Sequence, residues 1–251
     1  RTTMTKTVLI TGGAGGIGRE FCKLFNSDGY RIVVFSLLQE ELDALGQQLK
    51  SQRADVDYRP VQMDLSQPGA AEEIIQWLDR ENIELDVLVN NAAYQRHRDS
   101  LDDVSIEQWE TTFRTNIFGY FYMVKYAVPA MAPGSTIINT GSVTGLEGKS
   151  RLLDYSSTKG AIHAFTKSLA QSLVEQSIRV NCVAPGPVWT PLNPAERSDE
   201  EMGEFGEATP LGRPGQPEEM EPAYVFFASD ADSSYITGHV LPLLGGETTA
   251  G

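Results

Sequence analysis

A glycine-rich turn near the start of the chain restricts its fold more than any other stretch. The apolar run 7–10 leads into residues 11–18, and a helical pattern begins at Arg19. The glycines satisfy two spacings, Gly-x-Gly-x-x-Gly at positions 13, 15 and 18 and Thr-Gly-x-x-x-Gly-x-Gly over 11–18. A strand, a glycine turn and a helix N-terminus together bind pyrophosphate, because the backbone can approach closely and the helix supplies N–H donors and partial positive charge.

A glycine-rich turn of this kind has two other interpretations. A structural tight turn would use glycines in the same way without any ligand, and it stays open. A P-loop is excluded, because no Gly-Lys-Ser/Thr follows the glycines.

Apolar runs and helical patterns alternate along the rest of the chain. Strands are predicted at residues 7–10, 31–35, 56–63, 86–92, 136–141, 178–184 and 239–244, and helices at 19–29, 39–50, 69–80, 105–131, 155–175 and 218–228. This alternation indicates an α/β fold, a Rossmann-type doubly wound parallel sheet of about seven strands in three α/β/α layers. Since no repeat or linker divides the chain, we expect one domain over 1–251.

Composition excludes several classes of partner. The chain has 251 residues, of which 41% are hydrophobic, and a formal net charge of −14. Such acidity disfavours nucleic acid and anionic membranes, and no apolar run suits a transmembrane helix or signal peptide. Cys22 and Cys182 lie far apart in apolar segments, and the three histidines are scattered, so neither a disulfide nor a metal site is expected. These features predict a cytoplasmic protein.

Tyr155 and Lys159 are four residues apart, a spacing that stacks their side chains on one helix face. An ammonium beside a phenol stabilises the phenolate and lowers a tyrosine pKa from about 10 toward the range of an acid/base catalyst. Ser142 follows the predicted strand 136–141, which would deliver its hydroxyl. Taken alone, a Tyr-x-x-x-Lys pair is also common on ordinary helix surfaces.

Together these motifs resemble the short-chain dehydrogenase/reductase family, in its short single-domain branch. The resemblance covers essentially the whole chain. It rests on Thr11-Gly12 with Gly16 and Gly18, Asn90-Asn91-Ala92, Asn116, Ser142, Tyr155-x-x-x-Lys159, Pro185-Gly186 and Thr190. From about position 113 onward, stretches such as 186–191 and 212–217 resemble bacterial stress-type aldehyde reductases and glucose-dehydrogenase-like members.

The resemblance implies an NAD(P)-dependent oxidoreductase that moves hydride between nicotinamide C4 and a carbonyl or secondary alcohol. Tyr155 would exchange a proton with the substrate oxygen, while Lys159 would lower the Tyr155 pKa and hold the nicotinamide ribose. Ser142 would hydrogen-bond the substrate oxygen. Asn116 would position a proton-relaying water, although an asparagine inside a helix also often packs against a neighbouring backbone.

The cofactor site implied by the resemblance is spread over several strand ends. Asp64 would bind the adenine amine, or would serve instead as a helix cap. Ala93 stands where the family usually has glycine. The remaining cofactor-binding candidates are Gly12, Gly15, Gly16, Ile17, Gly18, Leu65, Asn90, Ala92, Tyr155, Lys159, Pro185, Gly186, Val188 and Thr190.

The choice between NAD and NADP depends on the end of the second strand. An NAD site usually has a carboxylate there for the ribose 2′-hydroxyl, but this chain has Ser36. An NADP site typically has a base at the next position or in the glycine loop, where this chain has Leu37 and residues 14–15. Arg19 and Ser36 remain candidates for a 2′-phosphate contact, so both cofactors stay open.

Substrate-pocket residues are expected beyond the C-terminal ends of the strands. The candidates are Tyr94, Val143, Thr144, Leu152, Pro187 and Trp189. Residues 188–215 would form a lid that excludes water. Four bases would lie at the cleft mouth and either steer an anionic carbonyl compound or pair with nearby acids: Arg96, Arg98, Lys149 and Arg151.

Apolar outer faces on the predicted helices 105–131 and 155–175, together with the resemblance, imply a homo-oligomer, a tetramer or a dimer. The substrate is expected to be a small carbonyl or alcohol; aldehyde, sugar, steroid and hydroxy acid all stay open. The alternative function is a non-catalytic dinucleotide-binding sensor, but such modules typically lack the tyrosine or the lysine. An epimerase or dehydratase of the extended branch would need a larger C-terminal region.

Overall fold

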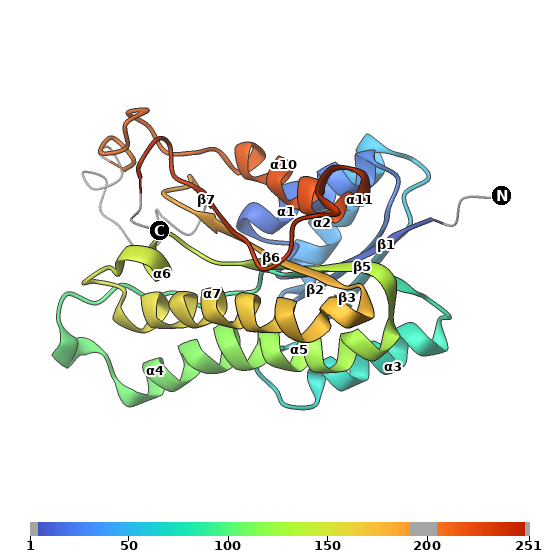
Figure 1. Cartoon of the computed structure of the whole chain (residues 1–251), viewed down its shortest axis with the longest axis horizontal. Coiled ribbons are helices and arrows are strands. Elements are labelled where there is room, and N and C mark those ends of the chain that lie inside the picture. The colour runs from blue at the N-terminus through green and yellow to red at the C-terminus, as the bar shows by residue number, and fades with distance from the viewer. Residues whose placement is uncertain (1–4, 191–204, 249–251) are drawn as a thin grey trace.

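A parallel sheet forms the centre of the molecule (Figure 1). The computed structural model describes residues 5–190 and 205–248. Within these residues seven strands are hydrogen-bonded in the order β3-β2-β1-β4-β5-β6-β7. They are β1 (Thr7–Thr11), β2 (Arg31–Ser36), β3 (Tyr58–Gln62), β4 (Leu85–Asn90), β5 (Met131–Thr140), β6 (Arg179–Pro185) and β7 (Val240–Leu243). The predicted doubly wound α/β fold is confirmed.

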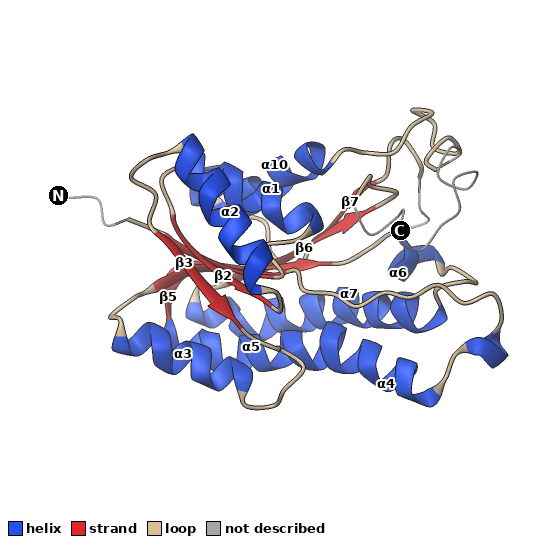
Figure 2. Ribbon diagram, turned by 180° about the vertical axis from the view of Figure 1, so that it is seen from behind, coloured by secondary structure: helices blue, strands red, loops and turns tan. Residues whose placement is uncertain are grey.

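Helices cover both faces of the sheet (Figure 2). One face carries α1 (Gly16–Ser27), α2 (Gln39–Gln52), α10 (Pro217–Ala228) and the short α11 (Asp230–Ser233). The other carries α3 (Ala70–Arg80), α4 (Ile106–Phe113), α5 (Gly119–Ala127) and α7 (Leu153–Leu173). The four-residue α6 (Thr144–Glu147) precedes α7, and short 3-10 turns span Leu101–Asp103, Val128–Ala130 and Val174–Gln176.

Alternating side chains of the buried strands supply two separate cores. Val8 and Ile10 of β1 pack with Val34 of β2 against α1, α2 and α10. Leu9 and Val33 point the other way and pack against α3, α5 and α7. Successive residues of a strand face opposite sides, so strands that are apolar throughout must be covered on both faces.

Two predicted helices differ most from the structure. The first helix begins at Gly16 and not at Arg19, because the last glycines of the turn already belong to its first turn. The predicted helix 105–131 is interrupted by a π-turn at Arg114–Phe118 and ends at Ala127, after which Met131 begins β5. π-turns of this kind are frequent at functional sites, and this one contains Asn116.

The strand order reverses between β1 and β4, and side chains join the two strands there. The Thr11 hydroxyl accepts hydrogen bonds from the backbone N–H groups of Asn91 (2.9 Å) and Ala92 (3.1 Å). The Asn91 amide donates to the Gly12 carbonyl at 3.2 Å. In open α/β sheets, ligands bind in the crevice at such a reversal, and these bonds fix its floor.

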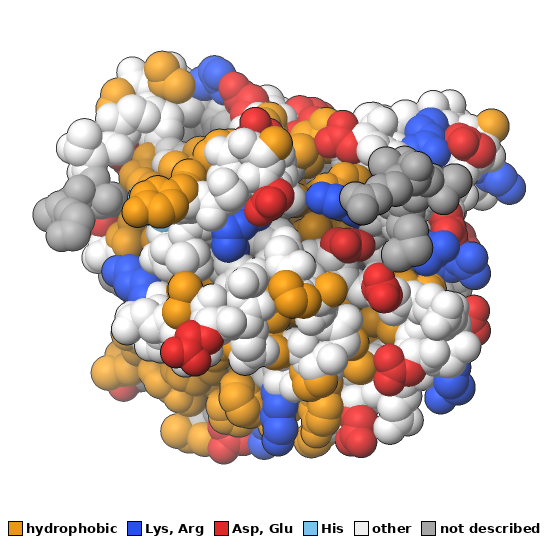
Figure 3. Space-filling model, turned by 45° about the vertical axis from the view of Figure 1, so that its right-hand side comes forward, with side chains coloured by type: hydrophobic (Ala, Val, Ile, Leu, Met, Phe, Trp, Pro, Cys, Tyr) orange, Lys and Arg blue, Asp and Glu red, His pale blue; other side chains and the backbone are white. Residues whose placement is uncertain are grey.

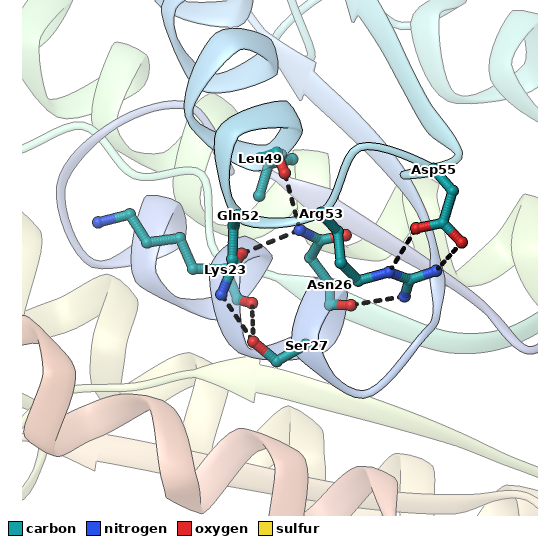
Figure 4. A network of polar contacts seen from close by, with 7 residues as sticks. All are labelled: Lys23, Asn26, Ser27, Leu49, Gln52, Arg53 and Asp55. Atoms are coloured by element: carbon teal, nitrogen blue, oxygen red, sulfur yellow. Dashed lines mark hydrogen bonds and ion pairs between the residues drawn. The ribbon is translucent and has the colours of Figure 1, made fainter.

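At the other end of α1, a polar network joins α1 to α2 (Figure 4). The buried Asn26 amide donates to the Leu49 carbonyl (3.1 Å) and to the Gln52 side chain (2.9 Å). Arg53 donates to the Asn26 carbonyl at 2.8 Å and pairs with Asp55. The network holds the two helices together. Both helices begin at the carboxyl ends of the strands, the edge of the sheet where the glycine turn lies.

Cys22 and Cys182 are both buried free thiols. Among the described residues, no helix is long and apolar enough to cross a membrane.

The contact between α1 and α10 gives a test of this packing. The rings of Phe21 and Tyr224 are buried and stack with their centroids 3.7 Å apart. Phe21→Ala should lower the free energy of unfolding by about 3–5 kcal/mol, because it removes this ring and leaves a cavity. Tyr235→Ala, at a fully exposed aromatic, is the control and should change it by less than about 0.5 kcal/mol. Urea unfolding followed by circular dichroism measures both, and equal effects would contradict the packing.

Candidate active site

The structure brings Ser142, Tyr155 and Lys159 into one cluster, in which Ser142 and Lys159 are buried and Tyr155 is half-buried. Helix α7 places Tyr155 and Lys159 one turn apart, and Ser142 follows the end of β5. The Tyr155 and Ser142 side chains are hydrogen-bonded. The Lys159 ammonium lies 5.3 Å from the centre of the Tyr155 ring and donates to the Thr140 carbonyl at 2.7 Å. A phenol, a hydroxyl and a cation thus meet at the carboxyl ends of the central strands.

Burial decides the protonation of this cluster. It raises the pKa of Tyr155 to about 12, which the hydrogen bond with Ser142 lowers only in part. It also lowers the pKa of Lys159, which is 1% exposed, to about 8. Lys159 is not among the groups that shift the Tyr155 pKa here, so its predicted lowering of that pKa stays a prediction, while desolvation of the phenolate acts in the opposite direction. At neutral pH Tyr155 is a protonated donor.

Asn116 fastens the loop after β4 to α7. Its side-chain oxygen accepts from the Tyr94 backbone N–H at 2.7 Å, and its amide donates to the Tyr94 carbonyl and the Thr158 hydroxyl, each at 3.0 Å. Thr158 lies between the tyrosine and the lysine of α7 in sequence. The backbone-packing interpretation of Asn116 is thus observed, whereas the water relay stays a prediction.

His163 is a residue of the site that the sequence interpretation missed. Its Nε2 accepts a hydrogen bond from the Ser142 backbone N–H at 3.3 Å. Gly141 and Gly145 make room for the ring, since a Cβ at Gly145 would lie 2.8 Å from its Cε1 and one at Gly141 would collide with Nε2. Burial, with Lys159 and Lys167, lowers the His163 pKa to about 4. Its position four residues after Lys159, on the same helix face, was the available signal.

A buried carboxylate fixes the start of α7. Asp154, immediately before the tyrosine, accepts hydrogen bonds from Thr112 (2.6 Å) and Gln108 (3.1 Å) of α4. Gln108 in turn accepts from the Arg98 guanidinium at 2.6 Å. This chain of contacts ties the loop after β4, α4 and α7 together beside Tyr155.

The four bases predicted at the cleft mouth therefore divide into two pairs. Arg98 is engaged by Gln108, and Arg151 pairs with Asp99 at 2.9 Å. For Arg151 the interpretation as a surface base paired with a nearby acid agrees with the structure, whereas the partner of Arg98 is a neutral amide. Arg96 and Lys149 are exposed.

The glycine turn fits an anionic group. Gly15 is the N-cap of α1 with no side-chain cap, so the first-turn N–H groups stay open to a ligand, and Gly16 has φ +48°. A Cβ at Gly18 would lie 2.5 Å from the Gly12 carbonyl, so only glycine allows this close approach. Together with Ile17, these residues could hold a pyrophosphate at a helix N-terminus.

The other cofactor-binding candidates lie at the same edge of the sheet. The Asp64 carboxylate accepts from the Ser66 N–H and hydroxyl, at 2.9 and 2.7 Å, which is a capped turn and leaves the adenine contact a prediction. The Asn90 side chain is fully buried and donates to Asn139, so a cofactor contact there would come from its backbone. The half-buried residues of this group are Leu65, Ala92 and Gly186, and the buried ones are Pro185, Val188 and Thr190.

At the ribose end, Ser36 is the last residue of β2, and its hydroxyl donates to the Glu41 carboxylate at 3.5 Å. Leu37 is 60% exposed. The Arg19 guanidinium donates to the Ala14 carbonyl at 3.1 and 3.3 Å. Arg19 is therefore turned toward the backbone of the glycine loop.

The residues predicted to line the substrate pocket differ in their exposure. Tyr94, Val143, Thr144 and Pro187 are half-buried. Leu152 is 5% exposed, and its contact with the substrate stays a prediction. Trp189 is 42% exposed, and its ring centre lies 6.3 Å from that of Phe205.

Much of the predicted lid 188–215 cannot be compared with the structure, since residues 191–204 lie outside the described residues. A hollow of about 590 Å³ lies between α6 and the first turns of α7. Thr144 lines it, but Tyr155 and Lys159 do not, so it is not where the chemistry would occur.

Comparison with known proteins gives the family. Residues 12–248 match the family model described as enoyl-(acyl carrier protein) reductase. Two relatives, each 44% identical, are the glucose and ribitol dehydrogenase of Daucus carota and the NADPH-dependent aldehyde reductase 1, chloroplastic, of Arabidopsis thaliana. They align over 98% and 96% of this chain and 86% and 85% of their own lengths. A solved Serratia marcescens short-chain dehydrogenase/reductase mutant has a TM-score of 0.87 at 25% identity, covering 96% of this chain and 97% of that one.

The chain belongs to the short-chain dehydrogenase/reductase family and is an NAD(P)-dependent oxidoreductase. The predicted similarity to aldehyde reductases and glucose-dehydrogenase-like members is confirmed by the names of these relatives. Nothing in the comparisons supports the alternative of a non-catalytic dinucleotide sensor.

His163 generates a prediction for stability against pH. Because its pKa falls from 6.5 to about 4 on folding, the unfolded chain binds more protons between these values, and the stability from this group is lost as the pH drops through that window. His163→Gln keeps an acceptor for the Ser142 N–H but does not titrate. It should reduce the loss of unfolding free energy between neutral pH and about pH 4.5 by about 1–3 kcal/mol.

Urea unfolding of both proteins at the two pH values measures this difference. Glu221, whose pKa burial raises to about 7, contributes the opposite slope, but it does so equally in both proteins. An equal loss of unfolding free energy in the wild type and in His163→Gln would rule out a buried neutral histidine.

Proposed function

We propose that this chain reduces a small carbonyl compound, or oxidises the corresponding alcohol, with Tyr155 as the acid/base. The observation that carries the proposal is that the end of β5 and helix α7 place the Ser142 hydroxyl beside the Tyr155 phenol, with the buried Lys159 ammonium 5.3 Å from the centre of the Tyr155 ring. When bound, the nicotinamide supplies the hydride in the reductive direction and accepts it in the oxidative one. The residues of this chain supply binding, orientation and the proton.

Two hydroxyls would meet the substrate oxygen. Ser142 would donate a hydrogen bond that orients it, while its own position is held by the His163 contact to its backbone. Tyr155, protonated at neutral pH because burial raises its pKa, would transfer its proton to this oxygen as the oxygen gains negative charge. Lys159 would stabilise the phenolate left behind.

Asn116 and Asp154 act on this chemistry through position. Asn116 holds the Tyr94 backbone and Thr158 together, and Asp154 fastens the first turn of α7 to α4. Both keep the tyrosine facing the end of β5. A water bound near Asn116 would carry protons from solvent toward Lys159, as the resemblance implies.

The catalytic assignment predicts the behaviour of Tyr155→Phe. Turnover of carbonyl substrates should fall at least about 100-fold, because the proton donor is lost, while NADH or NADPH affinity measured by fluorescence should change less than about threefold. Tyr126→Phe, a tyrosine of α5 remote from Ser142, is the matched control and should retain activity. Full turnover by Tyr155→Phe would contradict the assignment, and loss of cofactor binding would point to a structural role.

The names of the relatives guide the choice of substrates. One is a glucose and ribitol dehydrogenase and another an NADPH-dependent aldehyde reductase, so aldehydes, aldoses and polyols should be screened with both dinucleotides.

We also propose a single domain located in the cytoplasm, with residues 188–215 as the substrate lid, and no nucleic-acid or membrane partner. The support is the acidic charge of −14 and the sheet shared by all the described strands.

We infer a homo-oligomer, a dimer or tetramer, from apolar side chains exposed on α4, the π-turn and α5. They are Ile106, Trp109, Phe118 and Phe121. Figure 3 shows apolar side chains gathered over the lower part of the molecule, on the side of the sheet that these helices cover. Within α7, by contrast, Leu153 is the one large apolar side chain that is exposed, so α7 offers less of an apolar face than its pattern predicted. Exposed apolar patches of this kind mark protein interfaces.

The interface gives a test that does not depend on activity. The wild type should have the mass of a dimer or tetramer by light scattering at micromolar concentration, and Phe121→Glu should shift it toward smaller species, because a buried unpaired charge opposes association. Leu211→Glu, at an exposed leucine outside these helices, should leave the mass unchanged. A monomeric wild type would contradict the inference.

A further inference from the structure

The ribose end of the cofactor site contains a carboxylate that the strand pattern does not show. Glu41 lies in the first turn of α2. It accepts the hydrogen bond of the Ser36 hydroxyl at 3.5 Å. Its carboxylate also lies 3.6 Å from where a Cβ of Gly15 would be, with nothing else within 4 Å of that point. The acid therefore stands between the end of β2 and the bare N-terminus of α1.

This position has a defined chemistry in dinucleotide sites. A carboxylate about 20 residues after the glycine turn hydrogen-bonds the ribose 2′-hydroxyl of NAD, whereas NADP requires a base for its 2′-phosphate. Glu41 follows Gly18 by a similar number of residues, and it arrives from the helix after the strand end and not from the strand itself. Its carboxylate would accept a hydrogen bond from a 2′-hydroxyl, and its negative charge would repel a 2′-phosphate.

In the described part of the chain, no base forms an ion pair with this carboxylate. The Arg19 guanidinium is held by the Ala14 carbonyl, and Lys23 pairs with Glu20 at 2.7 Å. On the β3 side, Arg59 pairs with Asp57 at 2.7 Å, and the neutral Gln62 amide donates to the Leu37 carbonyl at 2.9 Å. Among the described residues, Glu41 is therefore the charged group that contacts Ser36.

We propose that Glu41 makes this enzyme select NAD(H) over NADP(H), by binding the 2′-hydroxyl and repelling the 2′-phosphate. The inference rests on the proposed function only in requiring that a dinucleotide bind at the glycine turn. It assigns to Glu41 the role that a strand-end acid would have at position 36. The Ser36 hydroxyl, which donates to the carboxylate, orients it toward the ribose.

The experiment measures dissociation constants for NADH and NADPH by fluorescence titration, without substrate. The wild type should bind NADH at least about tenfold more tightly than NADPH, and Glu41→Gln should reduce this ratio at least about fivefold, mainly by tightening NADPH, because the repulsion is removed. Glu40→Gln is the matched control. It removes the same charge from the same helix turn, but at an exposed residue with no contact to Ser36, and should change the ratio less than about twofold.

The outcomes separate the inference from the function on which it rests. Equal or tighter binding of NADPH by the wild type, or equal shifts in Glu41→Gln and Glu40→Gln, would overturn the role of Glu41 while the oxidoreductase assignment stands. Failure of the wild type to bind either dinucleotide would instead remove the dinucleotide site itself. Thermal unfolding of both variants verifies that they remain folded, and Glu41→Ser provides a second neutral variant should Glu41→Gln unfold.

Discussion

The bond from the buried Lys159 ammonium to the Thr140 carbonyl is the contact on which the rest of the site depends. At 2.7 Å it joins α7 to the end of β5, and the aromatic rings of Tyr120 and Tyr155 lie 5.8 and 5.3 Å from the same cation. A buried charge is tolerated only when it is hydrogen-bonded. Because this one is satisfied from the strand, the helix is fixed in the rotation that faces Tyr155 toward Ser142.

Desolvation shifts the pKa of each titratable group around this contact toward its neutral form. It raises the pKa of Tyr155 and lowers the pKa values of Lys159 and His163, so each neutral form is favoured. Tyr155 and His163 are neutral at neutral pH, while Lys159, with a pKa of about 8, is still mostly charged. A protonated phenol and a single nearby cation are what a proton donor to a carbonyl oxygen requires, and the low dielectric strengthens both.

Two helix N-termini flank the cofactor end of the sheet, and they differ in charge. The N-terminus of α1 begins in glycines and carries no acid in its first turn, so its amides are open to an anion. The first turn of α2 carries Glu40 and Glu41. A pyrophosphate is therefore favoured at one helix and a second phosphate disfavoured at the other, within a chain whose net charge is already −14.

Local patterns in the sequence determined the parallel sheet, the glycine turn and the Tyr155–Lys159 spacing, because strand alternation, helix period and glycine conformations are properties of neighbouring residues. The sequence pattern placed the ends of the first helix and of the interrupted helix 105–131 less well. Only the tertiary structure decided that Glu41 reaches Ser36, that His163 supports Ser142, and that Asp154 is buried against α4. It also showed that burial raises the Tyr155 pKa, which the spacing to Lys159 does not indicate. These features depend on register and burial, which bring side chains from separate elements together and remove water from them, and neither can be read from spacing along the chain.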